Sequence, residues 1–417
     1  MKSWSSPSLP TLETPAPALR MRAEPTGEVE PVPVDKPVGV YVCGITPYDT
    51  THLGHAATYV TFDLAIRALR NAGHPVTYVQ NVTDIDDPLL ERAARDGIDW
   101  VDLAQREIEI FHGDMEALRN IAPQHYVGVV ETMPRHVEVI QKLVADGVAY
   151  GLPVDEPEAG APGVQDFYLD LSTQPSFGAT SGWTREQMLE VFADRGGDPD
   201  RAGKRDVLDP LLWRGRRVGE PHWDGGELGD GRPGWHLECT TIALDHLGVS
   251  FTLQGGGTDL VFPHHEMSAV QAEALTGKSP FARRYAHQAM VAYDGEKMSK
   301  SLGNLVKVSV LRAAGVDPMA VRLAVLDHHY GTDWEYTDDQ LTRAQERLAT
   351  WRDVAARAGD TDADDLITTI TAALAEDLDS PFALAAVDAW AARNAQAESG
   401  DSPRVRAAID AVLGVAL

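Results

Sequence analysis

The stretch VGVYVCGITPYDTTHLGH, residues 38–55, decides the fold of this chain. Its first six residues form a short apolar run with β-branched and aromatic members that ends at Gly44, which predicts a buried strand. Apolar residues then recur at spacings of three and four through residues 55–71, which predicts a helix that Gly73 ends. The run VTYVQNV, residues 76–82, predicts the next strand. A strand–helix–strand unit of this kind indicates a parallel sheet with crossover helices.

Farther along the chain the pattern alternates between helical and strand-like segments. Helical spacing covers residues 88–120 and 132–146, and a further helix is expected after Pro263. The sheet is expected to resume at 249–254 and near 285–292. Between these segments, residues 151–235 are rich in Gly, Pro and Asp, which predicts an inserted, loop-rich region.

The last quarter of the chain predicts a helical region. Leu341, Ala344, Leu348, Trp351 and Ala355 recur at helical spacing, and three further helices are expected at 363–377, 380–398 and 402–414. We therefore expect an α/β protein with three parts: an extended, loosely structured lead-in at 1–35, a Rossmann-like catalytic domain at 36–305 with an insertion at about 148–235, and a helical domain at 306–417.

Composition and charge exclude several classes of protein. A chain of 417 residues fits two or three domains. No apolar run is long enough to span a bilayer, and the first 20 residues do not read as a signal peptide, so we expect a cytoplasmic protein with no membrane partner. Two cysteines rule out a disulfide scaffold. The net charge is −27, and residues 331–417 hold 17 Asp and Glu against 7 Arg, which argues against a nucleic-acid partner.

Two short motifs, 242 residues apart, indicate one site for ATP. The first is Thr51-His52-Leu53-Gly54-His55, at a predicted helix start where backbone N–H groups and the helix dipole favour phosphate. His52 and His55 would donate hydrogen bonds to phosphate oxygens, and Gly54 would let the nucleotide approach the backbone. The second is Lys297-Met298-Ser299-Lys300-Ser301, in which Lys297 and Lys300 would hold the departing pyrophosphate. Either motif alone is equally compatible with a capped helix or a solvated loop, but the pair in this order predicts adenylation of an acid.

The pair resembles the HIGH and KMSKS signatures of class I aminoacyl-tRNA synthetases. Three further segments resemble cysteinyl-tRNA synthetase in particular, namely NVTDIDD at 81–87, GRPGWHLECT at 231–240 and GGGTDLVFPHHE at 255–266. The resemblance covers roughly residues 38–330 and implies a class I synthetase (HUP-type) parallel sheet. It also implies activation of cysteine as an adenylate, with ATP and Mg²⁺ as the reagents.

The same resemblance implies one zinc ion per chain, held by Cys43, Cys239 and His264. Two thiolates and an imidazole leave a fourth tetrahedral position open, where the thiolate of substrate cysteine would bind and serine would bind poorly. Spacing alone favours two buried free cysteines instead, because the chain has no CxxC pair. Cysteinyl-tRNA synthetases usually carry a glutamate four residues after the histidine, and here that position is Ser268; Glu266 is the nearest acidic residue. This departure argues against an ordinary cysteinyl-tRNA synthetase.

The resemblance also assigns residues to the substrates. Those around the cysteinyl-adenylate are Gly44, Ile45, Thr46, Thr58, Asn81, Val82 and Thr83, with Asn81 and Thr83 facing the ammonium group. Trp235 would wall the cysteine pocket, and Val291 would frame adenine through its backbone. Gly257, Thr258 and Asp259 suit the ribose, because a carboxylate accepts from sugar hydroxyls. Loop geometry or core packing explains each of these residues equally well.

The acceptor of the activated cysteine separates two enzyme families. Only 116 residues follow Ser301, which leaves little room for reading an anticodon. The run Asp194-Arg195-Gly196-Gly197-Asp198-Pro199 and the stretch 43–59 resemble the cysteine ligases of mycothiol biosynthesis, which join cysteine to the amine of glucosaminyl-inositol. Asp194, Arg195 and Asp198 would lie near an acceptor pocket or form a turn around the two glycines. We therefore expect a monomeric ligase whose substrates are ATP, L-cysteine and glucosaminyl-inositol; the alternatives are a cysteinyl-tRNA synthetase with a reduced C-terminal region and a non-catalytic binding module.

Overall fold

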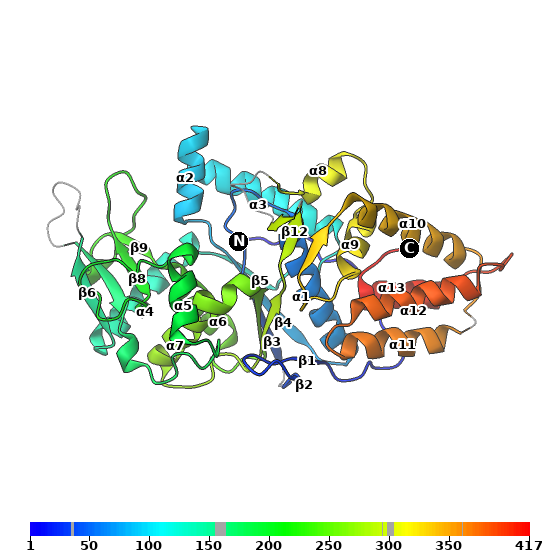
Figure 1. Ribbon diagram of the computed structural model, residues 1–417, viewed down its shortest axis with the longest axis horizontal. Helices are drawn as coiled ribbons and strands as arrows, with labels where there is room; N and C mark the ends of the chain where they lie inside the picture. The colour runs from blue at the N-terminus through cyan, green and yellow to red at the C-terminus, as the bar shows by residue number, and fades with distance from the viewer. Residues whose placement is uncertain (35–36, 155–163, 294, 298–303, 361) are drawn as a thin grey trace.

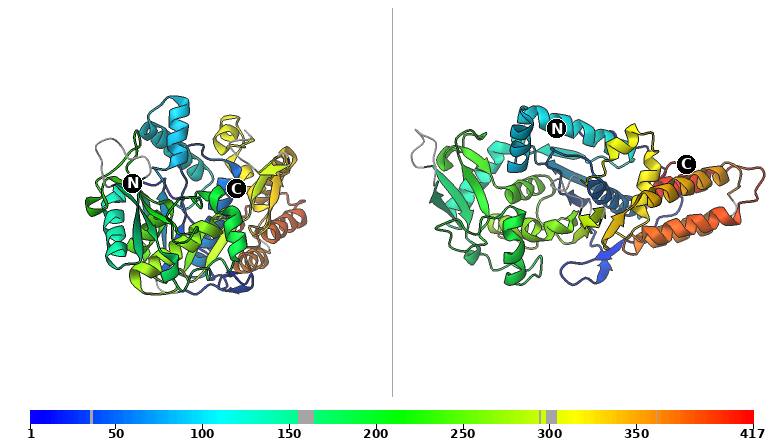
Figure 2. Two further views of the ribbon diagram at one scale, coloured as in Figure 1. Left: turned by 60° about the vertical axis from the view of Figure 1, so that its left-hand side comes forward. Right: turned by 45° about the horizontal axis from the view of Figure 1, so that its top comes forward.

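The computed structural model describes residues 1–34, 37–154, 164–293, 295–297, 304–360 and 362–417, with only the backbone of Glu296 and Lys297. A central parallel sheet is flanked by an inserted region at one end and a helical bundle at the other (Figures 1 and 2). The α/β class with a helical C-terminal region is confirmed.

The central sheet is built from five parallel strands in the order β11-β10-β3-β4-β5. From the centre toward one edge, the sheet contains β3 (Val38–Val42), β4 (Val76–Val82) and β5 (His125–Gly128) in this order. On the other side are β10 (Leu253–Gly257) and β11 (Tyr285–Gln288). The chain therefore changes direction across the sheet between β3 and β10, and at such a switch point α/β proteins bind their ligands beyond the carboxyl ends of the strands.

The two faces of β3 pack against different helices. Val38, Val40 and Val42 belong to the same core as α1 (Leu53–Asn71). Tyr41 and Cys43 point to the other face and pack with α6 (Trp235–Leu247). Because side chains alternate along a strand, the pattern of β3 directs Cys43 toward the helix that carries Cys239.

The first predicted unit is confirmed, and the later strands differ from prediction in register. The predicted segments 38–43, 55–71 and 76–82 correspond to β3, α1 and β4. The strand expected at 249–254 lies at 253–257, since its glycines are part of the strand. A Cβ at Gly255 would lie 2.2 Å from the ring of Phe62 on α1, so glycine here lets the helix pack closely on the sheet. The strand expected near 285–292 is two strands in different sheets, β11 and β12 (Val291–Tyr293), and β12 pairs with β13 (Glu296–Lys297) and β14 (Trp334–Tyr336).

The helical stretch expected at 88–120 is interrupted once. It consists of α2 (Asp87–Asp96) and α3 (Trp100–Ala117), because Gly97 ends α2 with a left-handed backbone at φ 67°. The next helix, α4 (Met133–Ala145), agrees with the prediction of 132–146, and α7 (Glu266–Thr276) follows Pro263 as expected.

The loop-rich insertion expected at 151–235 is present, but it also holds a small sheet that the sequence did not predict. This region contributes an antiparallel sheet of β6 (Ala149–Pro153), β7 (Gln165–Leu169), β8 (Leu211–Gly215) and β9 (Gly231–Pro233), together with helix α5 (Arg185–Phe192). Its strands are three to five residues long, and three of the four contain Gly, two of them with Pro as well, so their sequences resemble turns.

The N-terminal region is packed rather than loose, which the sequence did not indicate. Trp4 is 6% exposed, and its indole N–H donates to the carbonyl of Asn120 at 2.9 Å. Strands β1 (Arg20–Arg22) and β2 (Val29–Pro31) form a hairpin. The Arg22 guanidinium pairs with Asp377 of the bundle at 2.8 Å, and Arg284, beside β11, pairs with Glu30 at 3.1 Å. The hairpin thus joins the edge of the central sheet to the bundle.

The C-terminal region is helical as predicted. Its helices are α8 (Val308–Ala313), α9 (Pro318–Leu326), α10 (Asp338–Ala355), α11 (Ala363–Ala375), α12 (Ser380–Arg393) and α13 (Pro403–Leu413). No helix in the described part of the chain is long and apolar enough to cross a membrane.

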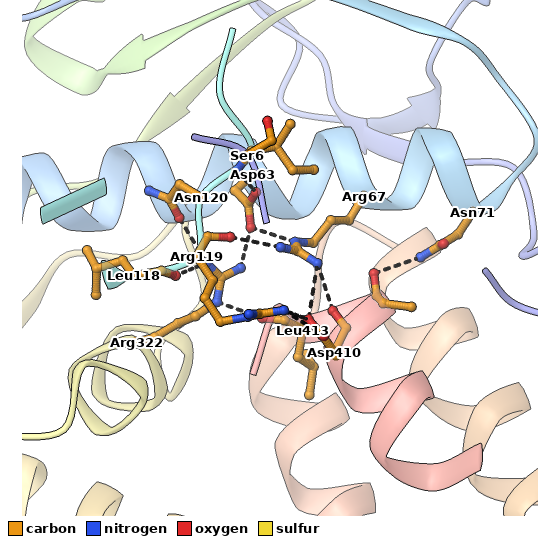
Figure 3. Close-up of polar contacts among 12 residues, drawn as sticks. Ser6, Asp63, Arg67, Asn71, Leu118, Arg119, Asn120, Arg322, Asp410 and Leu413 are labelled. Carbon is orange, nitrogen blue, oxygen red and sulfur yellow. Dashed lines mark hydrogen bonds and ion pairs between the residues drawn. The ribbon is translucent and has the colours of Figure 1, made fainter. Parts of the chain in front are cut away.

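A buried ionic network ties the bundle to α1, the helix that begins at the first ATP motif (Figure 3). The carboxylate of Asp63 accepts from Arg67 Nε at 2.7 Å and from Arg322 on α9, and all three side chains are buried. The two guanidinium groups also donate to carbonyls at the end of α13, namely those of Asp410 and Leu413, both at 2.7 Å. Burial alone would raise the pKa of Asp63, but the charges of Arg67 and Arg322 outweigh it and lower that pKa.

Asp63→Ala is expected to destabilise the protein by about 3–5 kcal/mol, because two buried guanidinium groups would lose their common counter-charge. Urea unfolding near neutral pH measures the loss. Since the pKa of Asp63 is lowered in the folded state, its stabilisation is present above about pH 3.9 and is lost as the pH falls below that value. Asp364→Ala is the matched control, since it removes an exposed carboxylate that pairs with Arg404, and its midpoint should stay near that of the parent. Equal midpoints for both variants would contradict the role given to the network.

Candidate active site

The predicted metal ligands lie together at the switch point of the central sheet. Cys43 directly follows β3, Cys239 lies on the second turn of α6, and His264 follows β10 in an irregular turn before α7. One ligand atom from each lies within 4.8 Å of the others, and all three residues are buried. Segments 196 and 25 residues apart in the sequence thus converge on one point.

The chemistry of this cluster fits a metal ion. His264 Nδ1 lies 3.1 Å from His236 Nδ1, while its buried Nε2 has no hydrogen-bond partner among the described residues. Burial lowers the pKa of His264 well below its usual value, so the imidazole is in the neutral form that binds metals. Burial raises the pKa of the Cys239 thiol, and a bound cation would reverse that shift. Two thiols and a neutral imidazole at this separation suit a tetrahedral ion such as zinc.

A second layer of two histidines, His236 and His265, supports the ligands. The sequence assigned no role to either of them. His236 contacts the ring nitrogen of His264, and His265 Nε2 lies 3.3 Å from Cys43 Sγ. Partners of this kind orient ligands and set the tautomer of a metal-binding histidine. The only signal in the sequence was their adjacency to Trp235 and His264 inside the motifs.

Glu266 does not belong to the metal cluster found among the described residues, and both Glu266 and Ser268 have other partners. The Glu266 carboxylate accepts from the backbone N–H groups of Gly178 and Ser181, both at 2.7 Å. The Ser268 hydroxyl donates to the carbonyl of His236 at 3.2 Å. The Ser268 hydroxyl is therefore bonded to the backbone of His236, a second-layer residue.

The first ATP motif begins α1 as predicted. His52 is the N-cap residue, and its Nδ1 accepts from the His55 backbone N–H at 3.4 Å. The two imidazoles stack with centroids 3.7 Å apart, so both rings lie over the helix start. A Cβ at Gly54 would lie 3.0 Å from the His52 ring, which means that glycine here leaves room for that imidazole.

The second ATP motif is described only at its edges. The backbone of Lys297 pairs with Ala292 in β12, and Lys300 and Ser301 lie outside the described residues. The segment that follows the motif is bonded to the first motif: the Leu53 N–H donates to the Val306 carbonyl and the Val308 N–H to the Thr51 carbonyl, both at 2.9 Å. The segment 306–308, which follows the second motif, is therefore held at the start of α1.

Residues at the ends of β3 and β4 form a tight junction beside the metal cluster. The Asn81 side-chain oxygen accepts from the Gly44 N–H at 2.7 Å and lies 3.5 Å from Cys239 Sγ, while its amide nitrogen donates to Thr83 Oγ1 at 3.2 Å. A Cβ at Gly44 would lie 1.7 Å from the Asn81 carbonyl, so only glycine fits there. The Thr83 N–H donates to the Ile45 carbonyl at 3.0 Å. This packing explains Gly44 and Asn81 structurally, and their contact with a substrate stays a prediction.

The remaining predicted residues are distributed around the same end of the sheet. The Trp235 ring lies tilted against the His264 ring with centroids 4.5 Å apart, so Trp235 lies beside the cluster, and its role as a wall of the cysteine pocket stays a prediction. Gly257 ends β10, and Thr258 and Asp259 follow it in a half-buried turn. The other positions are Thr46 after β3, Thr58 on α1, Val82 at the end of β4 and Val291 at the start of β12, 3% exposed.

The run 194–199 forms a turn. Gly196 has a left-handed backbone at φ 85°. Asp198 accepts from the Tyr168 hydroxyl at 2.5 Å and pairs with Lys204 at 2.8 Å, and Arg195 donates to two backbone carbonyls. Asp194 is exposed. A turn around Gly196 is therefore present, and a contact of Asp194, Arg195 or Asp198 with the acceptor stays a prediction.

Comparison with known proteins agrees with this geometry and defines the class. Residues 30–346 match the family described as tRNA synthetases class I (C) catalytic domain, so the chain contains a catalytic domain of this class. Among solved structures, the Mycobacterium tuberculosis methionyl-tRNA synthetase in complex with methionyl-adenylate has a TM-score of 0.61 at 18% identity, over 91% of this chain and 89% of that chain. The LeuRS of Agrobacterium radiobacter K84 has a TM-score of 0.60 at 11% identity, over 94% and 84%. These identities bear on the fold alone.

Curated relatives narrow the class to one family of ligases. A protein of Kytococcus sedentarius is 56% identical over the whole of both chains, and one of Geodermatophilus obscurus is 55% identical over 100% of this chain and 99% of its own. One of Salinispora tropica is 58% identical over 91% and 92%. The three carry the name L-cysteine:1D-myo-inositol 2-amino-2-deoxy-alpha-D-glucopyranoside ligase, and the present chain belongs to this family, the cysteine ligases of mycothiol biosynthesis.

Proposed function

We propose that this ligase activates L-cysteine as cysteinyl-adenylate with ATP and transfers it to the amine of glucosaminyl-inositol, releasing AMP and pyrophosphate. The observation that carries the proposal is the Cys43–Cys239–His264 cluster at the switch point of a class I synthetase sheet. Such a cluster explains selection of cysteine, and the names of the relatives supply the acceptor.

Cysteine is selected at the metal cluster. One zinc ion held by Cys43, Cys239 and His264 would offer an open coordination position that a thiolate fills far better than a hydroxyl. Trp235, whose ring contacts that of His264, closes one side of the pocket and keeps water from the substrate side chain. Asn81 and Thr83, at the end of β4, lie where the ammonium group of the amino acid is expected.

Adenylation takes place at the start of α1. The cysteine carboxylate attacks the α-phosphorus of ATP, an anhydride forms, and pyrophosphate leaves with the bonding electrons. His52 and His55 donate to phosphate oxygens as charge develops, and the helix N-terminus, Lys297 and Lys300 stabilise the same charge, part of which Mg²⁺ would also offset when bound. Gly257, Thr258 and Asp259 hold the ribose, Val291 lies at adenine, and the residues around the mixed anhydride are Gly44, Ile45, Thr46, Thr58 and Val82.

The second step forms an amide. The acceptor amine attacks the cysteinyl carbonyl carbon, the acyl carbon–oxygen bond breaks, AMP leaves, and the nitrogen loses a proton to solvent. A neutral amino sugar needs hydrogen bonds rather than a surface that neutralises phosphates.

The charge of the bundle favours this acceptor over tRNA, the alternative. Residues 331–417 carry 17 acidic residues against 7 arginines. Five of these arginines pair with aspartates of the chain itself, namely Arg347, Arg352, Arg357, Arg404 and Arg406. We therefore propose that nucleic acid is not a substrate.

The active form requires both thiols in the reduced state, and both are free and buried. We propose a reducing compartment, the cytoplasm, and a monomer, which light scattering of the zinc-loaded protein tests.

Cysteine-dependent exchange of pyrophosphate into ATP tests the first half-reaction. The zinc-loaded protein is expected to exchange with cysteine and to be inactive with serine. Absence of exchange with zinc and Mg²⁺ present would refute both enzyme interpretations and favour a non-catalytic binding module.

A further inference from the structure

Residues 258–265, the loop that carries His264, have an irregular backbone. Residues 258–265 form a short 3-10 turn followed by a π turn, and Phe262 is extended inside it at φ −139° and ψ 134°. Its backbone cannot complete a regular ladder of hydrogen bonds, so carbonyls along it must find partners elsewhere. The loop holds both Asp259, the proposed ribose contact, and the proposed metal ligand.

Arg195 of the inserted region supplies those partners. Its Nη1 donates to the Asp259 carbonyl at 2.9 Å and to the Phe262 carbonyl at 2.5 Å. Its guanidinium carbon lies 5.6 Å from the ring centroid of Trp183, which adds a cation–π contact. One charged side chain thus connects the two ends of the short segment that precedes His264.

The inserted region encloses the rest of the loop as well. The ring of Phe262, 0% exposed, lies between Trp183 and Phe192, with centroids 6.0 and 6.3 Å away. The Glu266 carboxylate, just after the loop, accepts from backbone groups of the turn at 178–181. These contacts come from residues 178–195, so the insertion grips the loop on both sides of His264.

The turn that bears Arg195 is itself anchored to the inserted sheet. A Cβ at Gly197 would lie 2.5 Å from the Phe192 ring, so the turn requires glycine there. Asp198 accepts from Tyr168 on β7 and pairs with Lys204. The run 194–199 therefore has three parts: an arginine directed at the loop, a glycine turn, and an aspartate that anchors the turn.

We propose that Arg195 is a positioning residue for the loop 258–265. Through Arg195, the inserted region fixes the positions of His264, the proposed metal ligand, and Asp259, the proposed ribose contact. For catalysis this inference rests on the whole proposed function, and for metal binding it rests only on the zinc site within it. Substitution of a residue that orients metal ligands typically lowers metal affinity by about 10- to 100-fold.

The test compares Arg195→Gln and Arg195→Lys with the control Arg185→Gln. Arg185 lies in the same inserted region and pairs with Asp206 at the surface. Competition with a chelator gives the affinity for Zn²⁺, the absorption spectrum with Co²⁺ reports ligand geometry, and pyrophosphate exchange gives KM for ATP and for cysteine separately from kcat.

Arg195→Gln is expected to weaken Zn²⁺ binding by about 10- to 100-fold, alter the Co²⁺ spectrum and raise both KM values. Arg195→Lys should recover part of each change, because its ammonium still donates to carbonyls, and Arg185→Gln should match the parent. If Arg195→Gln does not fold, Arg195→Lys should still show a smaller loss of Zn²⁺ affinity and a shifted spectrum.

Parent-like Zn²⁺ affinity and Co²⁺ spectrum in a folded Arg195 variant would overturn the proposal, even if its Tm were lower. Failure of the proposed function is distinguishable, because it would be seen in the parent protein as absent exchange.

Discussion

Cys239→Ala is expected to strip zinc from the protein and to abolish its preference for cysteine over serine. Cys239 supplies one of three ligand atoms in a buried cluster, and the remaining thiol and imidazole are too few to hold the ion tightly. Discrimination by a site built for one polar group can reach about 10⁴-fold, and most of it should vanish without the ion. Metal analysis and exchange with each amino acid measure the two effects, and Cys43→Ala and His264→Ala should behave alike.

Thr241→Val is the matched control for the metal variants. Thr241 lies two residues beyond Cys239 on α6, is 1% exposed, and has a hydroxyl with no hydrogen-bond partner among the described residues. This variant should keep one zinc ion per chain and the parent selectivity. Full zinc content in Cys239→Ala, with selectivity intact, would remove the metal site from the account.

His55→Ala is expected to lower cysteine-dependent pyrophosphate exchange by about 10²–10³-fold, the usual cost of removing one preorganised donor to developing charge. The loss should appear in kcat while zinc content stays at the parent value, because His55 lies on α1 and the metal cluster does not include it. His55 is a better choice than His52, whose ring also caps the helix. Exchange kinetics at saturating cysteine, together with metal analysis, measure both quantities.

His222→Ala serves as the control for that variant, since His222 is an exposed histidine in the inserted region. It should retain parent exchange. If His55→Ala exchanged as fast as His222→Ala, the first motif would be a helix cap without a catalytic role.

The sequence predicted the central part of the fold well because its signals there are local. Strand β3, helix α1 and strand β4 each have a clear apolar pattern, and Gly44 follows β3 and Gly73 follows α1. Strand β10 was misplaced because its glycines resemble a loop, whereas they are needed for close packing of Phe62. The inserted sheet was missed because its strands are short and interrupted, and pairing between distant segments leaves no local pattern.

In the candidate site, too, some residues could be predicted from the sequence and others could not. The metal cluster was predicted by resemblance, and the structure gives a reason for its geometry: alternation along β3 directs Cys43 to the face that carries α6. The second-layer histidines had no sequence signal beyond their adjacency to Trp235 and His264, and the two carbonyl contacts of Arg195 had none, because these contacts depend on how a loop, a turn and a helix meet in space.

The identity of the product tests the central claim most directly. The zinc-loaded protein is given ATP, Mg²⁺, cysteine and both acceptors, glucosaminyl-inositol and tRNA, and the products are analysed by mass spectrometry. The account predicts cysteinyl-glucosaminyl-inositol together with AMP, and no cysteinyl-tRNA. Cysteinyl-tRNA without the amino-sugar amide would contradict it.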